Sequence, residues 1–157
     1  MKIGIVYYSH TGHTQRVVAQ LASRLQDLGF NPDLLKLETL VPINFREARV
    51  LIKEGPAIDT DDALILATPV HGGRMCAPLR SFLDGQASLD GRQVACLATH
   101  FFPRGWGADQ ALGELVSACR AKGAEVLGQE SVQWFSIRRK QGMHRAVEGI
   151  SALFVNL

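Results

Sequence analysis

The stretch KIGIVYYSHTGHT, residues 2–14, decides the fold class of this chain. Residues 2–7 form an apolar run rich in β-branched side chains, which is typical of a buried strand. Hydroxyls and a glycine follow, and apolar residues then recur at helical spacing from Gln15 to Leu28, ahead of Gly29, where a helix would end. The stretch therefore predicts a strand, a short loop and a helix.

The same alternation of strand and helix continues along the 157 residues. Further strands are predicted at residues 33–37, 63–67, 94–98 and 125–132, and further helices at residues 76–84, 108–121 and 143–155. Only the segment from Thr39 to Pro56 is irregular. Strands that alternate with helices of this length require a mostly parallel sheet, because right-handed crossovers place helices on both faces. We expect one α/β domain over residues 1–157, a doubly wound three-layer sandwich with a five-stranded parallel sheet.

Composition narrows the class of protein. Hydrophobic residues make up 46% of the chain and charged residues 20%, which is typical of a globular domain. The net charge of +2 is too small and too scattered for nucleic-acid binding, and the basic run Ser136–Lys140 is interpreted as a solvated loop. No apolar stretch is long enough to span a bilayer and no basic leader precedes the first strand, so we expect a cytoplasmic protein.

The three cysteines, Cys76, Cys96 and Cys119, are spaced unlike a zinc or redox motif. Their odd number also argues against a disulfide framework. We interpret Cys96 and Cys119 as core residues and assign Cys76 no role.

The loop after the first strand is suited to an anion. Ser9, Thr11 and Thr14 offer hydroxyls where a helix begins, and the free N–H groups and macrodipole of a helix start attract negative charge. The alternative is that these hydroxyls only cap the helix. The sequence lacks the G-x-x-x-x-G-K-[ST] and G-x-G-x-x-G loops. It also lacks the cysteine and arginine of a phosphatase loop and the acidic pair of a response-regulator receiver.

This loop resembles the phosphate loop of the flavodoxin family, [ST]-x-T-G-x-T, with Ser9, Thr11, Gly12 and Thr14 at the matching positions and His10 and His13 at the variable ones. The resemblance implies non-covalent FMN, with its phosphate held by these hydroxyls and by backbone N–H groups. It also implies the strand order 2-1-3-4-5 and the short-chain type. In such a sheet, ligands bind at the carboxyl ends of the strands where the strand order reverses.

The loop after the third strand, residues 67–75, contains Pro69, Val70 and His71 ahead of the pair Gly72-Gly73. The resemblance implies that this loop lies beside the flavin, and that the Gly72–Gly73 peptide turns over on reduction and favours the half-reduced state. Two glycines permit such a rotation. The alternative is an ordinary turn.

The loop after the fourth strand, residues 99–107, is rich in aromatic residues. The resemblance implies that the turn Gly105-Trp106-Gly107 stacks on the flavin, with Phe101 or Phe102 as a rival. The alternative is a small hydrophobic cluster under a loop. The residues predicted to bind FMN are Ser9, His10, Thr11, Gly12, His13, Thr14, Pro69, Val70, His71, Gly72, Gly73, Thr99, His100, Phe101, Phe102, Gly105, Trp106 and Gly107.

Four histidines, at positions 10, 13, 71 and 100, fall in these three loops. We hypothesise that imidazolium charge near the flavin raises its reduction potential as pH falls, which an unchanged potential in His71→Gln would disprove. A metal site is the rival, but no carboxylate or cysteine is placed to complete it.

Two classes of function remain. The first is an electron carrier that moves single electrons between redox partners and needs no catalytic side chain. The second is an FMN-dependent NAD(P)H or quinone reductase, which the slightly basic charge favours because shuttle flavodoxins are usually acidic. A flavin-free binding module is a third possibility. We prefer the electron carrier, with a partner protein or a small-molecule donor or acceptor, and expect a monomer or weak homo-oligomer.

Overall fold

A computed structural model describes residues 1–157 in full. Its elements, in chain order, are β1 (Lys2–Tyr7), α1 (His13–Asp27), β2 (Asn31–Lys36), β3 (Ala63–His71), β4 (Arg74–Met75), α2 (Ala77–Gly85), β5 (Gln93–His100), α3 (Ala108–Ala121), β6 (Glu125–Gln133) and α4 (Arg139–Val155).

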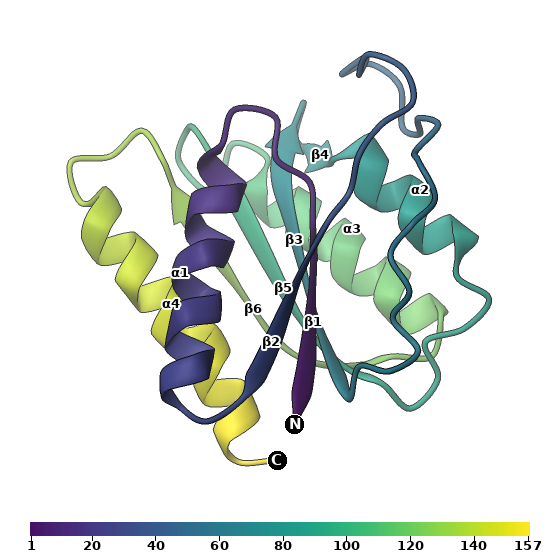
Figure 1. Cartoon of the computed structure of the whole chain (residues 1–157). Helices are drawn as coiled ribbons and strands as arrows, with labels where there is room; N and C mark the ends of the chain where they lie inside the picture. Colours follow the sequence, from purple (N-terminus) through teal and green to yellow (C-terminus); the bar gives the residue numbers. More distant parts are fainter.

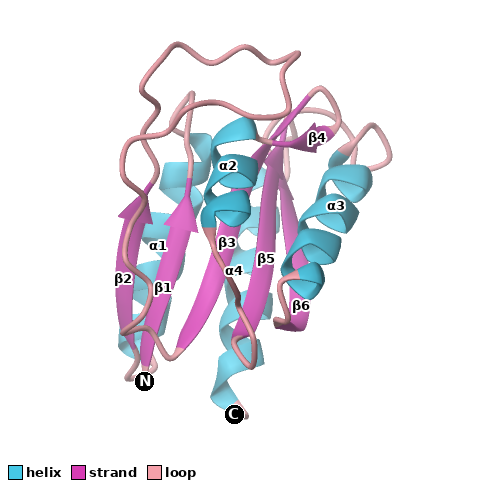
Figure 2. Ribbon diagram, turned by 90° about the vertical axis from the view of Figure 1, so that its right-hand side faces the viewer, coloured by secondary structure: helices cyan, strands magenta, loops and turns pink.

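Five of the strands form a parallel sheet in the order β2-β1-β3-β5-β6, and β4 pairs antiparallel with β3 at one end of it. Counted without β4, this is the predicted order 2-1-3-4-5, so the predicted fold is confirmed. Helices α1 and α4 cover one face of the sheet, whereas α2 and α3 cover the other (Figures 1 and 2). The carboxyl ends of β1, β3 and β5 therefore meet at one edge.

Side chains of β1 alternate between the two cores, as a period of two residues requires. Ile3 and Ile5 pack with the buried residues of α1 and α4, while Val6 packs with those of α2 and α3. Cys96 and Cys119 lie in the second core, so their assignment as core residues is confirmed.

The region between β3 and α2 differs from the prediction. β3 runs on to His71 instead of ending at residue 67, so Pro69, Val70 and His71 lie on a strand and not in a loop. A two-residue turn follows, with φ of +59° at Gly72 and +75° at Gly73. Hairpin turns with two left-handed residues match the twist of their strands and demand glycine or asparagine, which is why the chain can turn back here.

The long connection from β2 to β3 carries little regular structure, as predicted, apart from an isolated bridge between Thr39 and Ile52. The segment between the two bridge residues is tied to α2, because the Val50 N–H donates to Ser81 Oγ at 3.0 Å. No helix in the structure has the length and apolar character needed to cross a membrane.

Candidate functional site

The loop between β1 and α1 presents free backbone donors at the carboxyl edge of the sheet. Gly12 takes a φ of +88° and precedes the first helical residue, His13. The N–H groups of residues 11–14 donate to no backbone acceptor, whereas the Gln15 N–H is taken by Ser9 Oγ at 3.2 Å. This arrangement fits an anion at the positive end of the α1 dipole.

The three predicted phosphate hydroxyls differ in their surroundings. Ser9 accepts the helix N–H described above, and Thr14 is buried with its Oγ1 2.7 Å from Thr99 Oγ1, a contact that joins the first loop to the end of β5. Thr11 is exposed at the loop. Thr11 is therefore the hydroxyl best placed to meet a bound phosphate.

The β3–β4 hairpin and the start of α3 touch through glycine backbones. A Cβ atom added to Gly107 would lie 2.6 Å from the Cα of Gly73, a distance that no side chain tolerates. Gly107 also has a φ of +118°, which favours glycine. The predicted flavin loops after β3 and β5 thus pack against each other.

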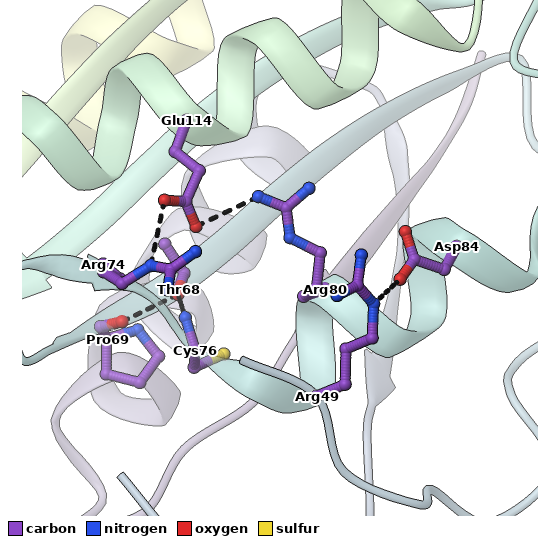
Figure 3. A network of polar contacts seen from close by, with 8 residues as sticks. All are labelled: Arg49, Thr68, Pro69, Arg74, Cys76, Arg80, Asp84 and Glu114. Carbon is purple, nitrogen blue, oxygen red and sulfur yellow. Dashed lines mark hydrogen bonds and ion pairs between the residues drawn. The ribbon is translucent and has the colours of Figure 1, made fainter. Parts of the chain in front are cut away.

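The hairpin is fixed to its surroundings by a polar network (Figure 3). Glu114 of α3 pairs with Arg74 Nε at 3.3 Å and with Arg80 Nη2 at 3.0 Å. The Thr68 hydroxyl accepts the Cys76 N–H at 2.9 Å and donates to the Pro69 carbonyl at 2.7 Å. These contacts hold both ends of the hairpin.

One pocket of about 180 Å³ lies at this edge of the sheet, between the β1–α1 loop, the ends of β3 and β5, and the β2–β3 connection. Its lining residues are His10, Thr11, His13, Thr14, Phe45, Pro69, Val70, His71, Thr99, His100 and Phe101. Ten of these eleven were predicted from the sequence. The predicted residues outside this lining are Ser9, Gly12, Gly72, Gly73, Phe102, Gly105, Trp106 and Gly107.

Among the aromatic candidates, the structure brings Phe101 to the pocket and not Trp106. Trp106 is 73% exposed and contacts Phe102, with their ring centroids 5.7 Å apart. The turn Gly105-Trp106-Gly107 leads into α3, and its contribution to the pocket is the close approach of Gly107 to the hairpin.

Sequence reasoning missed two aromatic residues. Phe45, from the β2–β3 connection, meets the His71 ring edge-on at 4.5 Å and the His10 ring at 5.3 Å. Trp134, just after β6, stacks on His13 at 4.2 Å with the planes 15° apart. The signal for Trp134 was its place directly after a strand, whereas nothing in the irregular segment marks Phe45.

Burial disfavours the charged form of three of the pocket histidines, His13, His71 and His100, so the imidazolium hypothesis at His71 stays a prediction. Burial, followed by the nearby His10, lowers the pKa of His71 to about 4. Desolvation is also the main cause of a lowered pKa at His13 and His100, with Arg139 adding to it at His13. His100 Nδ1 lies 2.5 Å from the Phe102 carbonyl. No cluster of three or more His, Cys, Asp or Glu side chains is arranged to hold a metal ion.

The residues present fit FMN. Free N–H groups of residues 11–14 offer a cradle for its phosphate. His71 Nδ1 is buried without a hydrogen-bond partner, and such an atom calls for a polar ligand group. The rings of His71 and Phe101 provide flat walls for the isoalloxazine.

Comparison with known proteins agrees with this fold. In curated sequences, the chain is 32% identical over 143 residues to an NAD(P)H dehydrogenase (quinone) of Syntrophus aciditrophicus, covering 83% of this chain and 63% of that protein. The chain thus spans about 63% of this relative's length. Flavodoxin 1 from Bacillus cereus shares the fold, with a TM-score of 0.69, 16% identity and coverage of 99% and 98%. A flavodoxin, WrbA-like protein from Agrobacterium tumefaciens also has a TM-score of 0.69, with 18% identity and coverage of 96% and 97%.

Residues 1–134 match the family model of NADPH-dependent FMN reductases. The match includes the strands and loops that form the pocket, up to and including Trp134. It confirms the flavodoxin-like resemblance and the predicted FMN cofactor. The chain belongs to the NADPH-dependent FMN reductase family.

Proposed function

We propose that this protein is an FMN-dependent reductase that oxidises a nicotinamide nucleotide and reduces a small acceptor of the quinone class. The observation that carries the proposal is the match of residues 1–134 to a reductase family. Curated relatives named NAD(P)H dehydrogenase (quinone) support the same class of reaction. The sequence alone favours an electron carrier, and that preference stays unconfirmed.

In the balanced reaction, NAD(P)H, one proton and the quinone give NAD(P)⁺ and the hydroquinone. Bound FMN supplies the site that takes a hydride from the nicotinamide and returns two electrons to the acceptor. The residues of the chain would bind the FMN and orient it. Thr11 and the N–H groups of residues 11–14 would hold the phosphate, while His71 and Phe101 would border the flavin ring. Phe45 adds an aromatic wall that suits a flat acceptor.

The electron carrier is the second candidate, and one observation favours it. Phe102 and Trp106 are 55% and 73% exposed beside the pocket, and a docked protein would cover such apolar surface. The net charge of +2 argues the other way, because acidic shuttle proteins use charge to steer onto basic partners.

Anaerobic titration of the FMN-loaded protein separates the two candidates. We expect NADPH or NADH to bleach the visible flavin spectrum at a catalytic rate, and added menadione to restore it over many cycles. Reduction by dithionite alone, with no response to either nucleotide, would support the electron carrier. Failure to bind FMN at all would overturn the site as well as the proposed function.

A further inference from the structure

A basic cluster of three residues, Arg138, Arg139 and Lys140, stands at the start of α4. With Ser136, Ile137 and Gln141 it lines a surface hollow of about 440 Å³. None of the three cations takes part in an ion pair. The sequence has no acidic residue from position 131 to position 147. No acidic side chain therefore pairs directly with the positive charge of this hollow.

The basic cluster adjoins the cofactor pocket. The Arg139 guanidinium lies 4.8 Å from the centre of the Trp134 ring, and Trp134 in turn stacks on His13 of the pocket lining. Arg16 approaches the same indole at 5.9 Å. Arg139 thus anchors the cluster beside the pocket through a cation–π contact, which leaves Arg138 and Lys140 free to meet a ligand.

An exposed aromatic surface connects the basic cluster with the pocket. Phe135 is 69% exposed and stacks on Phe101 at 5.8 Å with the ring planes 12° apart. Phe101 lines the pocket, and Phe135 is three residues from Arg138. The exposed Phe135 ring thus borders the pocket, and the two free cations follow it three and five residues later in the chain.

We propose that Phe135, Arg138 and Lys140 bind the adenosine 2′-phosphate end of NADPH and so set a preference for NADPH over NADH. This inference rests on the proposed function, because it assumes that the nicotinamide end reaches the flavin. An aromatic face accepts a purine ring, and arginine pairs with phosphate oxygens through two parallel N–H groups. NADH lacks the 2′-phosphate, so only NADPH uses the two free cations.

Direct binding tests the site without any redox reaction. The FMN-loaded protein is titrated calorimetrically with adenosine 2′,5′-bisphosphate and with 5′-AMP. The variants are Arg138→Gln/Lys140→Gln and the matched control Arg145→Gln, an exposed cation of the same helix outside the hollow. We expect the bisphosphate to bind wild type and control alike, and to bind the double variant at least about tenfold more weakly, since two charge-assisted contacts are lost. 5′-AMP should bind more weakly than the bisphosphate to wild type and change little in the double variant.

Steady-state kinetics provide a second test of this site. In the double variant the KM for NADPH should rise by about tenfold or more, while the KM for NADH and both kcat values stay near wild type. Phe135→Ala should raise the KM for both nucleotides, because both carry adenine.

The outcomes separate this inference from the proposed function. If NADPH reduces the flavin but the bisphosphate does not bind, or binds the double variant as well as wild type, the inference is wrong and the reductase stands. Weaker FMN binding in the double variant would also overturn it, because the cluster would then serve the flavin phosphate. If an acidic protein binds the basic cluster and the bisphosphate does not, the inference is wrong and the ligand of the cluster is a protein. If the bisphosphate binds but neither nucleotide reduces the flavin, the reductase fails and the adenosine phosphate site stands.

Discussion

His71 is an ionisable side chain whose charged form is disfavoured by burial in the folded protein. Burial lowers its pKa to about 4 from an ordinary value of 6.5, so between these values the unfolded chain binds more protons than the folded one. The free energy of unfolding should therefore decrease as the pH falls through this window. Urea unfolding of the FMN-free protein at about pH 7 and about pH 5 measures the loss. His71→Gln should lose less stability than wild type over the same interval, and an identical loss would contradict the burial of this ring.

Gly107 should be irreplaceable for reasons of space and of backbone conformation. Gly107→Ala brings a Cβ to 2.6 Å from Gly73 Cα at a φ of +118°, so we expect a loss of about 1–3 kcal/mol in unfolding free energy. A Cβ atom added to Gly113 of α3 would have no neighbour within 4 Å. Gly113→Ala should therefore raise the free energy of unfolding by about 0.5–1 kcal/mol. Chemical denaturation of the two variants compares them directly, and equal effects would refute the glycine contact.

At the scale of elements, Glu114 connects the β3–β4 hairpin to α3. Glu114→Gln removes the charge that pairs with Arg74 and Arg80, so the hairpin should become looser and the affinity for FMN should fall. The matched control is Glu38→Gln, whose partner Lys53 lies in the exposed β2–β3 connection. Fluorescence titration with FMN measures both, and equal affinities in the two variants would exclude a positioning role for Glu114.

The sequence predicted elements well where apolar periodicity is strong. Helix α3 has the predicted bounds, because Leu112, Leu115 and Val116 mark its buried face. α4 begins at Arg139, four residues before the prediction, since its first turn is polar and carries no periodic signal. β4 has only two residues, and its pairing depends on the backbone conformation of Gly72 and Gly73, which no hydrophobic pattern records.

The candidate site, too, was predicted well only where the sequence carries a clear pattern. The flavodoxin resemblance together with the loop order predicted ten of the residues at the pocket, because strand order fixes where the loops after β1, β3 and β5 meet. Phe45 escaped prediction since it is 51% exposed and lies in a segment without periodicity. The lowered pKa of His71 escaped it too, because desolvation depends on the tertiary structure around the ring.

At the scale of the whole molecule, binding of FMN should stabilise the fold. A ligand that binds only the folded state at about one hundred times its Kd adds about 2.7 kcal/mol. Riboflavin lacks the phosphate that the N–H groups of residues 11–14 would hold, so it should raise Tm less than FMN at equal concentration. Calorimetric scans of the protein alone and with each flavin provide the measurement. Equal shifts by the two flavins would show that the loop after β1 does not bind phosphate.

The walls of the pocket differ in how far their residues can change without endangering the fold, and Phe45 belongs to the more tolerant wall. The walls made by β3 and β5 are tied into the sheet, so most substitutions there also endanger folding. The wall made by Phe45 comes from a connection whose residues 37–62 contain no strand or helix and only one isolated bridge. Changes beside Phe45 alter this wall and leave the strand ladders intact, whereas Leu37 and Ile58 of the same connection are buried in the core. Under the proposed reductase function, changes beside Phe45 should therefore alter the choice of acceptor more than the binding of FMN.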